Sequence, residues 1–323
     1  MVKPPEFLRR PQHRDERTTH RHRGYAVAAL IFLSLVWGYN WVLMKEALRY
    51  ADPFQFAAWR TAIGAAALFL ILLIQGRLRW PAQFRGVATL GLFQIAIFTV
   101  VTMMALVASD PGKTSILVYT MPVWSMIFAW LLLGHKPNRI HLLATASATL
   151  GVLCMAQPWR ADVAMSGAFY GLAGAAAWGF SAVYATRLRE VGLDNLSMTA
   201  WSMGLGSALL VTVACFIPSK DIRWDSYFVF ILFYNSVLAM AVAWVLWTYV
   251  LASLSVMAAS LGVLAVPLVG SLSSATQLGE RFSPIELVGM SVILLGIAVV
   301  YWQGARGRLG IPSHNQRNEM ESL

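Results

Sequence analysis

The sequence predicts an all-α integral membrane protein whose ten transmembrane helices form two inverted repeats of five. Hydrophobic residues make up 58% of the 323 residues and charged residues only 12%, and the mean hydropathy is +0.61. Ordinary soluble domains are less apolar and carry about twice as much charge. Apolar runs recur along the chain, and motifs of the first half return in the second.

The apolar runs predict the positions of the helices. A hydrocarbon core of about 30 Å is crossed by about 20 apolar residues. We expect helices, in chain order, at 25–44, 54–75, 86–108, 114–133, 139–156, 167–186, 196–217, 227–251, 256–278 and 284–303. The stretch 227–278 is almost uninterrupted, and alignment with the first half places its turn at residues 253–256.

The net charge of +10 is distributed in a way that predicts topology. With the N-terminus inside, the inner segments hold 17 Lys and Arg and the outer segments hold 7. The positive-inside rule then places both termini in the cytoplasm and the chain in the inner (plasma) membrane. We expect residues 1–23 to be a disordered basic arm and 304–323 a cytoplasmic tail. Basic arms of this kind orient the chain or touch anionic lipid, so no nucleic-acid partner is expected.

Internal repetition divides the chain into units 24–157 and 166–303. The motif Trp37-Gly38-Tyr39-Asn40 has a counterpart in Trp178-Gly179-Phe180-Ser181, and Asp52 and Trp59 are matched by Asp194 and Trp201. SILVYTMPVW (115–124) aligns with SLGVLAVPLV (260–269). Because each unit has an odd number of helices, the second must enter the bilayer from the opposite side. Inverted repeats favour alternating access around a midplane site.

These motifs resemble the EamA-type branch of the drug/metabolite transporter superfamily. The resemblance rests on Trp37, Gly38 and Asn40, on Arg60, and on LGERFSPIELVG (278–289), and it covers residues 25–303. The aromatic-rich candidate cavity is most similar to aromatic amino acid exporters of the YddG type. The resemblance implies ten helices, cytoplasmic termini and efflux of aromatic and other neutral amino acids or related small metabolites. The first copy has Gly134-His135-Lys136 where the second has Gly279-Glu280-Arg281.

Aromatic and polar residues inside the predicted helices form the candidate substrate site. Helical spacing puts Trp37, Asn40, Trp41 and Met44 on one face. A single tryptophan is explained by packing, but polar groups inside a bundle usually face its interior or a water-filled cavity. The predicted substrate-binding residues are Trp37, Asn40, Trp41, Gln94, Phe98, Thr102, Tyr119, Trp124, Trp178, Ser181, Asn235 and Trp244.

Charge is nearly absent from the predicted spans. Arg60 is the exception, and it lies about 9 Å along its helix at the standard rise. We expect it to extend to the outer surface rather than to pair with a substrate carboxylate. The site should then be neutral, which suits a zwitterion with an apolar side chain or a neutral metabolite. A buried carboxylate for proton coupling is not expected there.

Two intramembrane prolines occupy equivalent positions of the repeats. Pro122 and Pro267 each remove a backbone hydrogen bond and free a carbonyl one turn earlier, near Val118 and Val263. They are candidate hinges, and a static kink is the alternative.

Other classes of protein fit the sequence less well. Cys154 and Cys215 lie singly in apolar stretches, so neither a disulfide nor a metal site is expected. The histidines lie in the tails or near one loop, which argues against an enzyme and against a cofactor. A receptor or scaffold does not predict an inverted duplication. We therefore expect a monomeric transporter, within the lipid bilayer, of an amino acid or of another neutral metabolite or drug.

Overall fold

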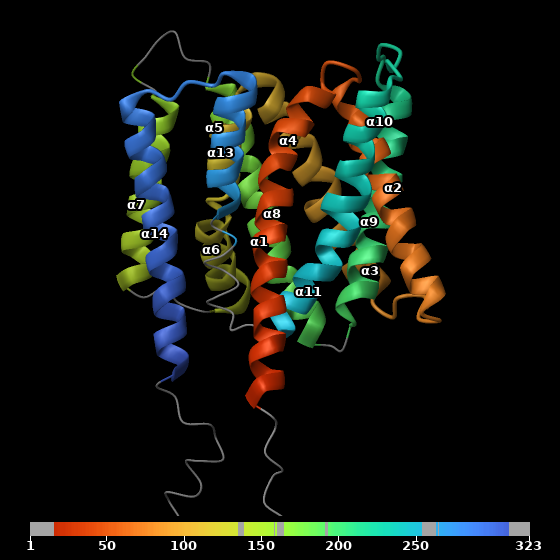
Figure 1. The fold of residues 1–323 in the computed structure, drawn as a ribbon, viewed down its shortest axis with the longest axis horizontal. Helices are drawn as coiled ribbons and strands as arrows, with labels where there is room; N and C mark the ends of the chain where they lie inside the picture. Colours follow the sequence, from red (N-terminus) through yellow and green to blue (C-terminus); the bar gives the residue numbers. More distant parts are fainter. Residues whose placement is uncertain are drawn as a thin grey trace, which may run out of the picture.

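The computed structural model describes residues 16–134, 139–157, 159, 165–190, 193–253, 263 and 265–309, and in this part of the chain all regular secondary structure is helical (Figure 1). The helices of the first half are α1 (Glu16–Ala47), α2 (Pro53–Ile74), the continuous segments α3 (Phe84–Leu90), η2 (Gly91–Ile97) and α4 (Phe98–Ala108), then α5 (Pro111–Val118), α6 (Met121–Leu133) and α7 (Arg139–Ala156). Those of the second half are α8 (Ser166–Glu190), α9 (Asn195–Phe216), the continuous segments α10 (Ser226–Phe233), η3 (Tyr234–Val242) and α11 (Ala243–Ser253), then α13 (Ala265–Leu278) and α14 (Pro284–Leu309).

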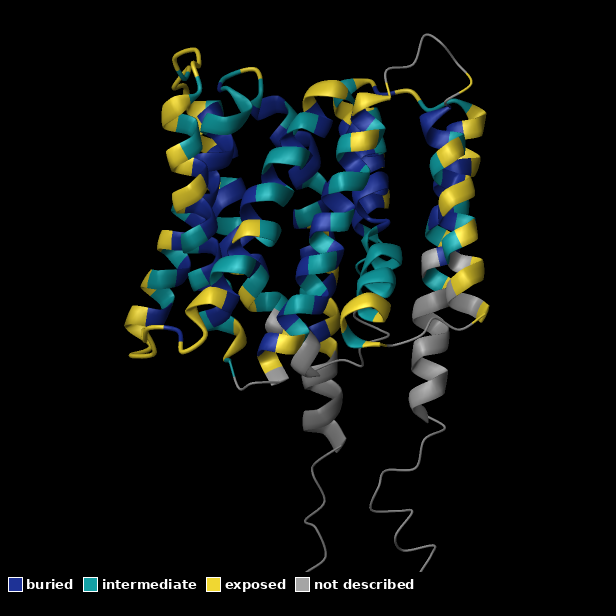
Figure 2. Ribbon diagram, turned by 180° about the vertical axis from the view of Figure 1, so that it is seen from behind, coloured by how far each residue is buried: buried dark blue, intermediate teal, exposed yellow. Residues whose placement is uncertain are grey.

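The helices are long and apolar enough to span a membrane. Within the described residues, six stretches meet both criteria: Gly24–Ala47, Pro53–Ile74, Phe84–Ala108, Pro111–Leu133, Asn195–Phe216 and Ser226–Trp247. Exposed residues lie along the outer faces of the bundle (Figure 2). Many of the exposed residues are large and apolar, for example Ile74, Leu131 and Phe216. Such a surface is stable in lipid and not in water. The chain is therefore a multi-pass membrane protein, and the count of ten spans stays a prediction.

Several helix ends differ from those expected. Helix α1 begins at Glu16, inside the segment predicted as a disordered arm, and residues 1–15 lie outside the described part. Helix α14 continues to Leu309. Helix α11 ends at Ser253, but the rest of the predicted turn at 253–256 falls on residues that the structure does not describe. The start of α1 and the end of α14 lie on the same side of the bundle (Figure 1).

One predicted helix, 114–133, is two helices in the structure. Helix α5 ends at Val118, and α6 begins at Met121. The cause is Pro122, which has no N–H to donate and whose ring would clash with the carbonyl of Val118 in a continuous helix. The Thr120 hydroxyl donates to the Leu117 carbonyl at 2.7 Å and so satisfies one acceptor at the break. Pro267 is the third residue of α13.

Matched aspartates begin matched helices in the two halves. The Asp52 carboxylate accepts from the Phe54 N–H at 3.0 Å at the start of α2. The Asp194 carboxylate accepts from the Ser197 N–H at 3.0 Å at the start of α9. Both satisfy donors that a helix N-terminus leaves free. The repeated aspartate is therefore a helix cap in both halves.

The packing of the helices is duplicated as well. Helix α2 packs against α9, and α7 packs against α14 at one edge of the bundle (Figure 1). Helix α1 packs against α13 and α11, and its counterpart α8 packs against α6 and α4. Segment η3 packs against α2, and η2 packs against α9. For each of these contacts, the counterpart helices in the other half make the same contact.

The glycine of each Trp-Gly pair permits the closest of these contacts. A Cβ atom added to Gly38 would lie 2.5 Å from Val269 Cβ in α13. A Cβ added to Gly179 would lie 2.7 Å from Trp124 Cβ and 2.8 Å from the Ser125 nitrogen in α6. Small residues let helix backbones approach in this way. The repeated glycine thus holds each proline-bearing helix against the opposite half.

The connection between α13 and α14 holds the N-terminus of α5. The buried carboxylate of Glu280 accepts from the Gly112 N–H at 2.9 Å and the Lys113 N–H at 3.1 Å. These are free donors of the first turn of α5. Burial raises the pKa of Glu280, because the hydrogen bonds only partly offset the lost hydration of the carboxylate. The Lys113 ammonium pairs with Glu286 at 2.8 Å.

We predict that Gly179→Ala destabilises the protein by about 1–3 kcal/mol, because its methyl group would overlap backbone as well as side-chain atoms of α6. Gly24→Ala is the matched control, since no heavy atom lies within 4 Å of a Cβ added there. The thermal midpoints of the purified proteins in detergent measure the difference. Equal midpoints for the two variants would contradict the close contact between α8 and α6.

We predict that Glu280→Ala costs about 1 kcal/mol of stability, because two N–H groups of α5 lose their acceptor.

The raised pKa of Glu280 means that the folded protein binds a proton on this carboxylate more tightly than the unfolded chain does. The stability contributed by Glu280 is therefore lost as the pH rises through its folded-state pKa. Glu280→Gln, which does not titrate, should have a flatter dependence of thermal midpoint on pH. An unchanged pH dependence in that variant would refute the assignment.

Candidate functional site

A cavity of about 140 Å³ lies where the two halves meet. Its walls come from α1, α2, η2, α4 and Tyr119 of the first half, and from α8, η3 and α11 of the second. An apolar cavity of about 150 Å³ admits one benzene-sized molecule. The size therefore matches a single aromatic ring or a branched aliphatic group.

Trp37 anchors one wall of the cavity. Its indole N–H donates to the Ala239 carbonyl in η3 at 2.9 Å. Its ring makes edge-to-face contacts with Trp244 and Trp247, at centroid distances of 6.3 and 5.9 Å. The indole N–H that would be costly in hydrocarbon is thus paired across the two halves. The ring is held rigidly enough to form a defined surface.

Trp178 forms the equivalent wall from the second half. Its ring lies 5.6 Å from that of Phe98 and 5.4 Å from that of Tyr119, the latter edge-to-face. Tyr119 occupies the break between α5 and α6, so the helix break delivers an aromatic ring to the cavity. The first tryptophan of each repeat therefore faces the same cavity, each backed by aromatic rings of the other half.

Both π-helical segments border the cavity. Gln94 and Ile95 come from η2, and Ala239 and Met240 come from η3. A π-helical turn leaves its backbone carbonyls offset from the usual α-helical partners, and such turns are frequent at functional sites. The Ala239 carbonyl shows the consequence, since it accepts from the Trp37 indole.

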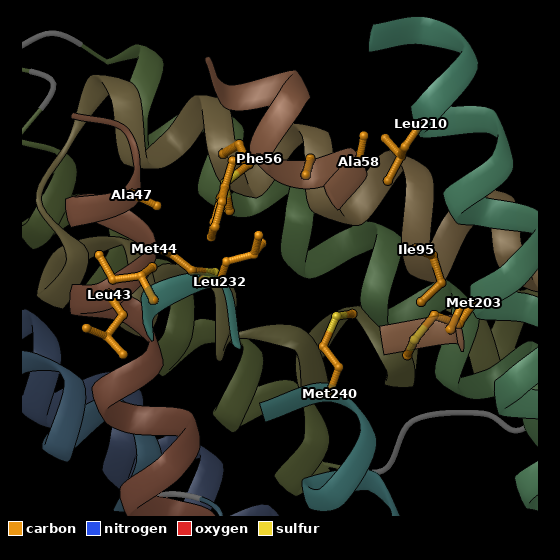
Figure 3. Close-up of a cluster of buried hydrophobic side chains, with 14 of the residues drawn as sticks. Leu43, Met44, Ala47, Phe56, Ala58, Ile95, Met203, Leu210, Leu232 and Met240 are labelled. Carbon is orange, nitrogen blue, oxygen red and sulfur yellow. The ribbon is translucent and has the colours of Figure 1, made fainter. Parts of the chain in front are cut away.

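Part of the cavity lining is apolar. Met44, Ile95 and Met240 line it and belong, with Phe56 and Leu232, to the largest buried cluster of the bundle (Figure 3). Methionine side chains are flexible and polarisable, and they adapt to ligands of differing shape. This lining favours an apolar body over a highly hydroxylated one.

Several polar groups at the cavity have no partner in the described part of the chain. They are the Asn40 Oδ1, Thr102 Oγ1 and Arg60 Nε atoms. Gln94 and Thr99 add an amide and a hydroxyl to the lining. Buried polar atoms are normally hydrogen-bonded, so unpaired ones at a cavity are candidates for ligand contact.

From its sequence position we expected Arg60 to extend to the outer surface, and this expectation was wrong. Its side chain is buried, with 9% of the residue exposed, and it lines the cavity. The guanidinium lies 5.9 Å from the centre of the Phe56 ring, and its Nη1 atom is 2.6 Å from the Met44 sulfur. Packing of α2 against α9 and η3 turns this face of the helix inward.

The structure brings together nine of the twelve predicted site residues. Those lining the cavity are Trp37, Asn40, Trp41, Gln94, Phe98, Thr102, Tyr119, Trp178 and Trp244. The other three lie outside it. Trp124 packs against Gly179, the Ser181 hydroxyl donates to the Trp178 carbonyl at 2.8 Å, and the Asn235 amide donates to the Ile231 carbonyl at 3.0 Å. The role of all twelve residues in substrate binding stays a prediction.

The lining also includes residues that helical spacing did not select. Ile95, Thr99, Ala239 and Met240 flank predicted positions or lie in the π-helical segments. The change in helical period turns residues that a 3.6-residue repeat would place elsewhere toward the cavity. No sequence motif marks that change. In the described part of the chain, no group of histidine, cysteine, aspartate and glutamate side chains could hold a metal ion.

The sequence matches the EamA-like transporter family twice, over residues 24–157 and 165–302. It is 28% identical to the uncharacterized transporter YoaV of Bacillus subtilis over 281 residues, which cover 83% of this chain and 94% of that protein. It is 23% identical over 280 residues to a protein of Salmonella typhimurium named a probable amino-acid metabolite efflux pump, covering 83% and 92% of the two chains.

The fold is similar to that of a solved crystal structure. It superposes with a TM-score of 0.60 at 20% sequence identity and covers 88% of this chain and 98% of the other. Duplicated helical units, an apolar exterior and the double family match agree with one another. The chain belongs to the EamA-like transporter family of the drug/metabolite transporter superfamily, and it is a transporter rather than an enzyme.

Proposed function

We propose that the protein exports amino acids, aromatic and other neutral ones, or related small metabolites, by alternating access around the cavity. The observation that carries the proposal is one aromatic-walled cavity, the size of a benzene ring, built from both halves of a duplicated bundle. The likeness to a protein named a probable amino-acid metabolite efflux pump supports the substrate class.

The proposed cycle exchanges the packing of the two halves. Counterpart helices already make counterpart contacts, so exchanging their conformations would open the cavity to the other side. We propose that the repeats are inverted, that both termini are cytoplasmic, and that Pro122 and Pro267 are the hinges. Pro122 follows the break at residues 119–120, where a backbone change costs the fewest helical hydrogen bonds.

Substitution of Trp41 tests whether the cavity binds the substrate. It is 5% exposed and lines the cavity. We predict that Trp41→Ala lowers phenylalanine flux in proteoliposomes about twofold to tenfold more than threonine flux, because an aromatic contact contributes about 0.5–1.5 kcal/mol. Trp130→Ala is the matched control, since Trp130 is exposed on α6.

A structural role for Trp41 has a different signature. Loss of a packed aromatic costs about 3–5 kcal/mol of stability. A large fall in thermal midpoint with equal loss of both fluxes would assign Trp41 to packing. Flux of a different neutral metabolite or a drug, with none of either amino acid, would favour that substrate class instead. Absence of any flux in sealed vesicles would point to a receptor or scaffold.

We also predict that amino acid flux depends little on an imposed pH gradient. No aspartate or glutamate is among the described residues that line the cavity, so no carboxylate there can carry a proton across. The measurement compares flux into the same vesicles with and without the gradient. Steep concentrative flux that survives Glu280→Gln and Glu286→Gln would overturn this prediction.

A further inference from the structure

Arg60 is a buried cation without a matching anion. No ion pair joins it to an acidic side chain among the residues that the structure describes. Its contacts are a thioether sulfur and the Phe56 ring, and its Nε atom has no partner. A thioether is a weak acceptor, and neither contact neutralises the charge. An unpaired buried charge is strongly unfavourable, so a compensating group is expected.

None of the buried acids of the described chain forms an ion pair with Arg60. Glu46 pairs through one oxygen with Arg49 at 3.2 Å and leaves its Oε1 atom without a partner, and Glu280 binds the N-terminus of α5. Glu286 pairs with Lys113 at 2.8 Å. These are the three buried carboxylates of the described chain. No described carboxylate is therefore paired with Arg60, and an anion in the cavity that Arg60 lines can supply the missing charge.

We propose that Arg60 binds the carboxylate of the transported molecule, and that the cavity takes apolar monocarboxylates whether or not they also carry an ammonium group. A guanidinium matches a carboxylate with two parallel hydrogen bonds, which a single point charge cannot make. The inference rests on the proposed transport function and narrows its substrate class.

The lack of an ammonium site follows from the same lining. The described lining residues include one cation and no aspartate or glutamate. An ammonium bound there would lie near Arg60 with no acidic side chain to pair with, and its contacts would be aromatic faces and the neutral side-chain oxygens of Asn40, Gln94, Thr99 and Thr102. A carboxylate alone would leave the site neutral. An aryl carboxylic acid or an aromatic oxo acid should therefore bind at least as well as the corresponding amino acid.

The first experiment uses the intact protein and three probes with one aromatic body. Phenylalanine carries both charged groups, hydrocinnamate only the carboxylate, and phenethylamine only the ammonium. Isothermal titration of the full chain in detergent measures their affinities. We expect hydrocinnamate to bind at least as tightly as phenylalanine, and phenethylamine to bind at least about tenfold more weakly, a difference of about 1.4 kcal/mol.

The second experiment changes the guanidinium. Arg60→Gln should weaken phenylalanine and hydrocinnamate about tenfold or more and leave phenethylamine within about twofold. Arg60→Lys should recover part of the loss, since it restores the charge but not the paired hydrogen bonds. Arg223→Gln is the control, because Arg223 is an exposed guanidinium near the same end of the bundle. Circular dichroism and thermal midpoints check that each variant is folded.

The outcomes separate this inference from the proposed function. Binding of phenethylamine as tight as that of phenylalanine, or equal weakening of all three probes in folded Arg60→Gln, would refute a carboxylate role. If hydrocinnamate bound tenfold more weakly than phenylalanine, the claim that no ammonium is needed would be refuted. If none of the three probes bound, both the carboxylate role of Arg60 and that claim would be refuted. The comparison of the three probes on the wild-type protein still tests the carboxylate preference of the cavity if Arg60→Gln does not fold. If the protein transports amino acids but the three probes do not bind in the expected order, only the inference about Arg60 is overturned. If the probes bind in the expected order but no flux is measured, only the proposed transport function is overturned.

Discussion

Polar groups inside a bilayer must find their partners within the protein, and most features of this fold meet that requirement. Asp52 and Asp194 satisfy the first turns of α2 and α9, and Glu280 satisfies the first turn of α5. The Trp37 indole reaches a carbonyl that a π-helical turn presents. Where the requirement is not met, the unpaired atoms of Asn40, Arg60 and Thr102 belong to residues around one cavity. Four further unpaired atoms in the described chain belong to Glu46, Thr114, Asn235 and Ser274, which are not among the cavity residues. At the cavity, a ligand can supply the missing partners.

The duplicated framework explains why the cavity lies at the centre. In each Trp-Gly pair the tryptophan faces the cavity, and the glycine allows close approach of a helix of the opposite half, α13 for Gly38 and α6 for Gly179. The residue that lines the cavity and the residue that allows the helix contact are thus adjacent along the chain. A shift of α13 on α1, or of α6 on α8, would displace the neighbouring tryptophan ring. The two walls of the cavity are mechanically connected to the interfaces between the halves.

The sequence was sufficient to predict the duplication, the membrane class and most of the cavity face of α1. These depend on local periodicity, and Trp37, Asn40 and Trp41 keep α-helical spacing. It was not sufficient to predict the helix break at 119–120 or the π-helical segments, because both depend on how neighbouring helices accommodate a changed backbone. The direction of Arg60 depended on which face of α2 is covered by α9 and η3. Position along a helix says nothing about that face.

The framework is duplicated, but its charge is not. The residue after Trp59 is Arg60, whereas the residue after the matched Trp201 is Ser202, whose hydroxyl donates to the Thr199 carbonyl within its own helix. One wall of the cavity can therefore attract an anionic group and the equivalent wall cannot. A symmetric frame with a single charge allows only one favourable orientation of a polar ligand, with its carboxylate toward α2 and its apolar body against the tryptophan walls. That orientation would persist through an exchange of the two halves, because Arg60 stays attached to one of them. In the proposed alternating-access cycle, specificity would then reside in a few side chains, and the duplicated backbone would supply the motion.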